Sequence, residues 1–197
     1  KLTLPVDPDD RAHRLQLPER YILSVGTLQA HKGIAQLIDA LASPALQGYT
    51  LLIAGPEGSQ GLDVAGIASN AGLAEGRVRA LGYLADADLA VALDRASVFV
   101  FPSLAEGFGL PVIEAFNFGT PVVHSDDPAV LEVSAGAGLA VAREPAESYA
   151  DRLAEAIGSV ASDPALAKRM GFAGRDRARA FSWTDSAEKI WQLHADL

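Results

Sequence analysis

The chain has 197 residues, with 25 Asp and Glu against 16 Lys and Arg and a formal net charge of −9 at pH 7. This acidic balance argues against binding of nucleic acids or anionic membranes through the surface as a whole. The absence of cysteine excludes disulfides and thiolate metal sites. The length suits one domain with a full core. Because we find neither a leader sequence nor an apolar run as long as a membrane span, we expect a soluble cytoplasmic protein. The abundance of Ala, Gly and Arg suggests a bacterial source.

Short apolar segments alternate with amphipathic segments from residue 21 onward. Six buried strands are expected, at residues 21–25, 50–54, 77–81, 98–101, 121–124 and 138–142. Helical spacing predicts helices at 34–41, 62–71, from 86, from 110, and at 129–133, 149–160, 164–179 and 183–194. This alternation predicts an α/β fold, a Rossmann-like doubly wound parallel sheet of about six strands with helices on both faces.

The pattern divides the chain into three parts. Residues 1–20 contain three prolines and little periodicity, and we interpret them as an interdomain connector. Residues 21–180 form the α/β domain, and residues 181–197 are expected to form a C-terminal helix. A chain that begins with a connector suggests a piece of a longer polypeptide.

The topology alone predicts where a ligand binds. In open parallel sheets, ligands bind at the carboxyl ends of the strands, near the point where the strand order reverses. The expected site is therefore built from the loops at those ends, which are residues 26–33, 55–58, 82–84, 102–109 and 125–128.

The loop after the fourth strand has the features of an anion site. Gly107 and Gly109 permit backbone angles and close approaches that a side chain would block. Pro111 suits the first helical turn, where its missing N–H costs nothing. The free amides near Gly109 and Leu110 then point outward, and together with the helix dipole they favour a bound anion.

Two carboxylates, Glu106 and Glu114, bracket this turn. A carboxylate repels phosphate but accepts two hydrogen bonds from a vicinal diol, which sugars and riboses both carry. We therefore expect amides to bind the diphosphate and carboxylates to bind hydroxyls. The alternative is that Glu114 merely complements a helix N-terminus and that Glu106 is a solvated loop residue.

Several segments resemble glycosyltransferase family 4, the group 1 glycosyl transferases, which have the GT-B fold. VFVFPSLAEGFGLPVIEAFNFGTPVV has the E-x7-E pattern of that family at Glu106 and Glu114. YILSVGTLQAHKG is similar to its donor-phosphate loop, LGYLADADLAVALDRAS to its base-binding segment, and FSW at 181–183 to its closing helix. The resemblance covers nearly the whole chain and implies the C-terminal, donor-binding domain of a GT-B enzyme.

The resemblance also implies a reaction and a set of residues. The reaction is a retaining, metal-independent transfer of a hexosyl unit from a nucleoside diphosphate (NDP) sugar, without a cofactor. Glu106 and Lys32 are the implied catalytic residues, the first on the sugar hydroxyls and the second on the diphosphate, while Glu114 binds the ribose diol. The implied donor-binding residues are Gly26, Thr27, His31, Lys32, Gly82, Tyr83, Leu84, Glu106, Gly107, Phe108, Gly109, Leu110 and Glu114.

The first loop departs from the common pattern of the family. Many members have an arginine in place of Thr27, and a subset with threonine has an arginine in place of His31. Only Lys32 is securely cationic here, since His31 contributes charge only when protonated.

The other partner is expected outside this chain. The resemblance implies an N-terminal acceptor-binding domain that would make any membrane contact. The chain alone is therefore expected to bind the donor without turnover. Nothing in the sequence specifies the sugar, the acceptor, or the base among UDP, GDP and ADP donors.

Two alternatives belong to other functional classes. A dinucleotide-binding dehydrogenase module would need G-x-G-x-x-G after the first strand, where this chain has GTLQAHKG. A non-catalytic interaction domain is left open by the missing arginine.

His124 ends a strand at the ligand edge, where it either lines the site or packs, and Glu132 is not expected to take part. Trp183 and Trp191 are expected to anchor a helix.

Overall fold

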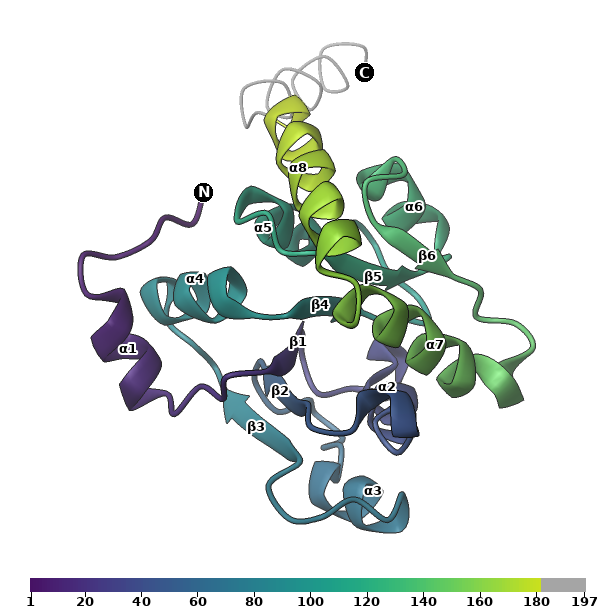
Figure 1. Ribbon diagram of the computed structural model, residues 1–197. Coiled ribbons are helices and arrows are strands. Elements are labelled where there is room, and N and C mark those ends of the chain that lie inside the picture. The colour runs from purple at the N-terminus through teal and green to yellow at the C-terminus, as the bar shows by residue number, and fades with distance from the viewer. Residues whose placement is uncertain (182–197) are drawn as a thin grey trace, which may run out of the picture.

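The computed structural model describes residues 1–181 (Figure 1). The predicted C-terminal helix, with Trp183 and Trp191, lies outside the described residues. Within residues 1–181 no helix has both the length and the apolar character needed to cross a bilayer. The elements in chain order are α1 Pro8–Arg14, β1 Tyr21–Val25, η1 Ala30–Lys32, α2 Ile34–Ala40, η2 Pro44–Leu46, β2 Thr50–Ala54, α3 Val64–Asn70, β3 Val78–Gly82, α4 Asp86–Arg95, β4 Val98–Phe101, α5 Leu110–Asn117, β5 Val122–Ser125, α6 Pro128–Ser134, β6 Leu139–Val141, η3 Ala146–Ser148, α7 Tyr149–Ala161 and α8 Pro164–Ala180.

Six strands form a parallel sheet in the order β3-β2-β1-β4-β5-β6. Each strand begins and ends within one residue of the predicted bounds. The central strand β1 pairs with β2 on one side and with β4 on the other, with Ile22 opposite both Leu51 and Val98. The prediction of a doubly wound parallel sheet is confirmed.

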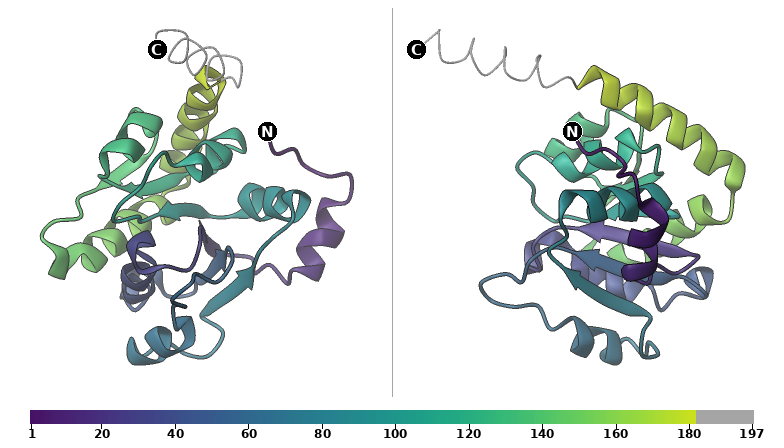
Figure 2. Two further views of the ribbon diagram at one scale, coloured as in Figure 1. Left: turned by 180° about the vertical axis from the view of Figure 1, so that it is seen from behind. Right: turned by 90° about the vertical axis from the view of Figure 1, so that its left-hand side faces the viewer.

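Alternation along the strands builds one core on each face of the sheet. Ile22 points into a core with side chains of α2 and α7, while its neighbours Tyr21 and Leu23 point into a core with α4, α5 and α6. Figure 2 shows the sheet between these two layers of helices. The helix α8 contributes Met170 to the first core and Ala178 to the second. Because both faces are covered, the strands β1, β2, β4 and β5 are buried along almost their whole length.

The helix α1 was not predicted, because residues 1–20 show little apolar periodicity. Its only buried side chain is Ala12, so ion pairs rather than an apolar stripe fasten it. Arg11 bonds Asp7 at 2.8 Å within the segment and Asp88 of α4 at 2.9 Å. A proline at the first position and acidic residues in the first turn suit the helix start.

The strand order reverses between β1 and β4, and the loops after these strands pack tightly there. Gly33 closes the loop after β1 with φ +71°. A Cβ at this position would lie 2.1 Å from the carbonyl oxygen of Pro102, at the end of β4. Only glycine allows this close approach, which places the loops 26–33 and 102–109 side by side.

We predict that Gly33→Ala costs at least about 2 kcal/mol more stability than Gly72→Ala. Both glycines have nearly the same positive φ, +71° and +76°, but a Cβ at Gly72 meets nothing within 4 Å. Gly72→Ala therefore carries only the backbone strain, about 1 kcal/mol. Urea unfolding of both variants measures the difference, and equal losses would show that the loops do not require the close contact.

Candidate functional site

An ion pair joins the two loops at the point where the strand order reverses. Lys32 Nζ lies 2.9 Å from Glu106 Oε2, and the two side chains are 20% and 14% exposed. Ser103 Oγ donates to the same Oε2 at 3.0 Å, while Oε1 accepts a longer bond of 3.3 Å from the amide of Gly107. The pair is therefore partly open to solvent, and Oε1 is its less engaged oxygen.

The surroundings of Glu106 stabilise its ionised form. Burial raises the pKa of Glu106, but the hydrogen bond and the charge of Lys32, together with Ser103, outweigh it. The net pKa of this carboxyl is therefore below its ordinary value of 4.5. Lys32 and Glu106 were predicted as separate contacts of a donor, and their pairing across 74 residues was not anticipated.

The helix α5 begins immediately after this pair. Its N-cap is Gly109 with φ +89°, and within residues 1–181 no side chain caps it. The amide of Val112 donates to the carbonyl of Gly109 at 3.0 Å, so the helical hydrogen bonds begin in the first turn. The first amides of an uncapped helix favour an anion. The neighbouring side chains of Phe108 and Leu110 are both 46% exposed.

Glu114 lies one turn into α5 in a different electrostatic setting. Its side chain is half-buried, and among the described residues no hydrogen bond reaches its carboxylate. Burial raises the pKa of Glu114, and the charge of Asp86 at the start of α4 raises it further. Asp86 follows the loop 82–84, so this loop and Glu114 belong to the same part of the site. Tyr83 in that loop is 76% exposed.

The remaining predicted positions contribute backbone rather than charge. Gly26 packs against Gly55, where a Cβ would lie 1.9 Å from the Gly26 carbonyl oxygen. His31 is exposed, and its carbonyl accepts a 2.8 Å bond from Leu104 N. Thr27 is half-buried. No hydrogen bond among residues 1–181 connects the loop 82–84 to Lys32 or Glu106, so the site has two separate parts.

His124 packs in the core instead of lining the site. It is 1% exposed, with Nδ1 2.7 Å from Ser125 O and Nε2 2.9 Å from Ser134 Oγ. Burial lowers the pKa of His124. The sequence allowed His124 either to line the site or to pack in the core, and the structure shows that it packs in the core. Glu132 is exposed on α6, and His13 is exposed on α1.

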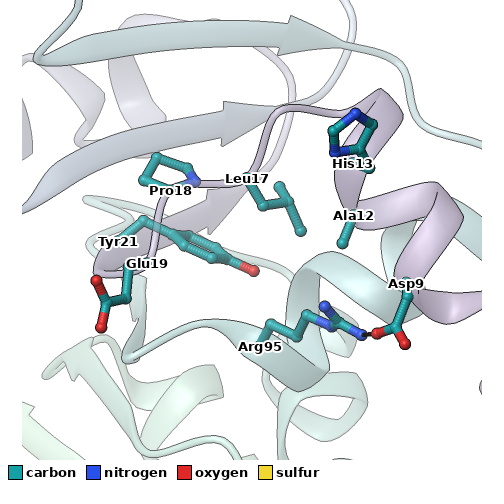
Figure 3. Close-up of a pocket in the computed structure, with 8 residues that line it drawn as sticks. All are labelled: Asp9, Ala12, His13, Leu17, Pro18, Glu19, Tyr21 and Arg95. Atoms are coloured by element: carbon teal, nitrogen blue, oxygen red, sulfur yellow. Dashed lines mark hydrogen bonds and ion pairs between the residues drawn. The ribbon is translucent and has the colours of Figure 1, made fainter.

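A cavity of about 390 Å³ lies at the opposite edge of the sheet, where β1 begins (Figure 3). Tyr21 lies across it from α1, and Arg95 forms an ion pair with Asp9 at its side. The hydroxyl of Tyr21 donates to Ala92 O at 2.6 Å. This cavity is distinct from the site at the carboxyl ends of the strands.

Comparison with known proteins places the chain in a family. The model of the glycosyl transferases, group 1, matches residues 6–177. The chain belongs to the group 1 glycosyl transferases. It is 32% identical to O-antigen chain mannosyltransferase B of Escherichia coli over 166 residues. The matched region covers 83% of this chain and 42% of that protein.

Solved structures of related enzymes share the fold of this group 1 chain. Sucrose-phosphate synthase from Thermosynechococcus elongatus superposes with a TM-score of 0.81 at 33% identity, over 98% of this chain and 49% of that one. The Anabaena protein HepE, in complex with UDP-glucose, gives a TM-score of 0.81 at 23% identity, over 99% and 54%. The chain thus spans about half the length of these relatives, and the fold is one half of the GT-B architecture.

We predict that the two glutamates affect stability in opposite directions. The folded pKa of Glu106 is lowered, so its ionisation stabilises the fold above the ordinary pKa, and this contribution is lost as pH falls through the folded value. At neutral pH, Glu106→Gln should cost about 1–2 kcal/mol because Lys32 loses its partner. The folded pKa of Glu114 is raised, so its ionisation destabilises the fold as pH rises through that value, and Glu114→Gln should increase stability at neutral pH.

The Glu114→Gln difference should disappear near pH 3, where wild-type Glu114 is protonated and resembles glutamine, and the Glu106→Gln difference should shrink as pH falls through the lowered folded pKa of Glu106. Urea unfolding of the three proteins at neutral pH and at about pH 3 measures this pattern. Glu132→Gln, an exposed glutamate on α6, is the matched control. A loss of stability in Glu114→Gln at neutral pH would contradict the assignment of an unpaired, partly buried carboxylate.

Proposed function

We propose that this chain is the donor-binding domain of a glycosyltransferase that transfers a hexosyl unit from an NDP-sugar. The proposal places it in family 4, as the C-terminal half of a GT-B enzyme with a retaining, metal-independent mechanism. The observation that carries it is the ion pair Lys32–Glu106 directly before the uncapped start of α5, at the reversal of strand order. The names of the relatives, a mannosyltransferase and a sucrose-phosphate synthase, support a sugar substrate.

The geometry supports a donor bound along the carboxyl edge of the sheet. The amides at Gly107 to Leu110 are suited to the distal phosphate because no side chain among residues 1–181 caps the start of α5, although the Gly107 amide already makes a 3.3 Å bond to Glu106. At the other part of the site, Glu114 offers to the ribose diol a carboxylate that has no hydrogen-bond partner among residues 1–181. The loop Gly82–Leu84, in which Tyr83 is 76% exposed, is suited to the base.

Lys32 can bind the diphosphate without leaving Glu106. An ammonium group has three donors, and Glu106 uses one of them. A second donor can reach a phosphate oxygen, while the less engaged Oε1 of Glu106 accepts from a sugar hydroxyl. In the transition state, negative charge develops on the leaving diphosphate, and the pre-placed Lys32 and the helix amides stabilise it. These groups would do the work that a metal does in other transferases.

The acceptor side of the reaction belongs to another domain in this proposal. The chain matches 42% of the mannosyltransferase and 49% of the sucrose-phosphate synthase. We propose that an N-terminal domain supplies the acceptor site and any membrane contact. Residues 1–20, with α1 docked on α4, connect the two domains.

We predict that the chain binds one of UDP-glucose, GDP-mannose or ADP-glucose and transfers no sugar by itself. Titration calorimetry with these three donors and with UDP, GDP and ADP tests binding, and product analysis tests transfer. Glu114→Gln and Lys32→Gln should each weaken donor binding by about tenfold, since each removes a charged hydrogen-bonding group. The exposed Glu132→Gln should change nothing.

The outcomes separate the alternatives. Binding that Lys32→Gln and Glu114→Gln do not weaken would mean that the donor binds elsewhere. If the chain binds none of the six ligands, a non-catalytic interaction domain becomes the better explanation. Sugar transfer by the chain alone would contradict the requirement for a second domain.

A further inference from the structure

A tyrosine of α7 donates a hydrogen bond to the segment 102–106, which carries Glu106. The hydroxyl of Tyr149 donates to the carbonyl of Pro102 at 2.9 Å, and the whole side chain is 1% exposed. The same carbonyl is the one that Gly33 approaches from the loop after β1. The backbone at Pro102 is therefore fixed on two sides, by a hydrogen bond and by a close contact.

Arg143, which follows β6, donates a hydrogen bond to the same segment at Leu104. Its Nη1 donates to the carbonyl of Leu104. Its Nε donates to Asp126 Oδ1 at 2.8 Å, and Nη1 also lies 3.4 Å from Asp127 Oδ2. One planar guanidinium thus joins the loops that follow β4, β5 and β6, a geometry that the single point charge of lysine cannot reproduce.

These contacts reach Glu106 through a short chain of bonds. The amide of Leu104 donates to His31 O at 2.8 Å and its carbonyl accepts from Arg143, so both polar groups of that peptide are fixed. Ser103 is fixed between Pro102 and Leu104, and its hydroxyl donates to Glu106 Oε2 at 3.0 Å. The position of the Glu106 carboxylate therefore depends on groups that lie outside its own loop.

We infer that Tyr149 and Arg143 are positioning residues that set Glu106 for the hydroxyls of the transferred sugar. The inference rests on the proposed function, in which Glu106 contacts the sugar, while Lys32, the amides at the start of α5, Glu114 and the loop 82–84 contact the nucleoside diphosphate. No bond among residues 1–181 connects Tyr149 or Arg143 directly to those groups. Loosening the segment should therefore weaken recognition of the sugar and leave recognition of the nucleotide unchanged.

The test compares two variants with two matched controls. Tyr149→Phe removes only the hydroxyl on Pro102, and Arg143→Lys keeps the charge but loses the fork. Tyr21→Phe is the control for the first, because its hydroxyl is equally buried and bonds Ala92 O at the other edge of the sheet. Arg79→Lys is the control for the second, because Arg79 also bonds main-chain carbonyls through its fork, at Leu15 and Gln16, away from residues 102–106.

Calorimetry measures each protein with the sugar nucleotide that the wild type binds, UDP-glucose, GDP-mannose or ADP-glucose, and with the matching diphosphate. In both test variants the dissociation constant of the sugar nucleotide should rise about fivefold, and that of the diphosphate should stay within about twofold. Both constants should stay within about twofold in the controls. Equal losses for the two ligands, or no loss of sugar-nucleotide binding, would overturn the inference.

Hydrogen–deuterium exchange separates this inference from the proposed function. The amides of residues 103–106 should exchange faster in Tyr149→Phe and Arg143→Lys than in the wild type and the two controls. If the wild type binds no donor, the proposed function fails, and this measurement alone judges whether the two residues hold the segment. Exchange equal to that of the controls would overturn the positioning role.

Discussion

The close packing of two loops at the reversal of strand order is the constraint on which the site depends. Gly33, at the end of the loop after β1, approaches Pro102, the first residue after β4, to a distance that a Cβ would prevent. Lys32 precedes that glycine, and Glu106 follows that proline by four residues. Their side chains can meet at 2.9 Å because the backbones are already in contact. The ion pair is thus a consequence of the topology as well as of the residue types.

The two glutamates of the site lie in opposite electrostatic settings. Glu106 is ionised and fixed by Lys32 and Ser103, so its position is defined before a ligand arrives. Glu114 is partly buried and lacks a hydrogen-bond donor within the described chain, so its charged form is the less stabilised one. A diol that donates to Glu114 would supply the missing donors. Part of the binding free energy would then come from relieving a cost already present in the free protein.

Much of the fold could be predicted from the sequence, because buried parallel strands are short apolar runs and the helices between them are amphipathic. The helix α1 could not, since it is held by Arg11 with Asp7 and Asp88 and buries only Ala12. Local pattern likewise showed that Glu106 and Glu114 bracket a helix start. The pairing of Glu106 with Lys32 depends on strand order, which local pattern does not encode.

Tyr149 and Arg143 carried no signal in the sequence, since a tyrosine at a helix start and an arginine after a strand are ordinary residues. Their importance follows only from what their donors reach, which is main chain 47 and 39 residues away.

The charge of the site also explains why main-chain groups matter so much here. The chain is acidic overall, with a net charge of −9, and an NDP-sugar is an anion. Thr27 brings no charge, and the charge of Lys32 is partly neutralised by Glu106. In the proposed site, the amides at the start of α5 would therefore carry much of the attraction for phosphate. Amides are effective only when the backbone presents them at a fixed place. At the start of α5 that place is set by the helix itself, whereas the bonds from Tyr149, Arg143 and His31 act on residues 102–104, which precede Glu106.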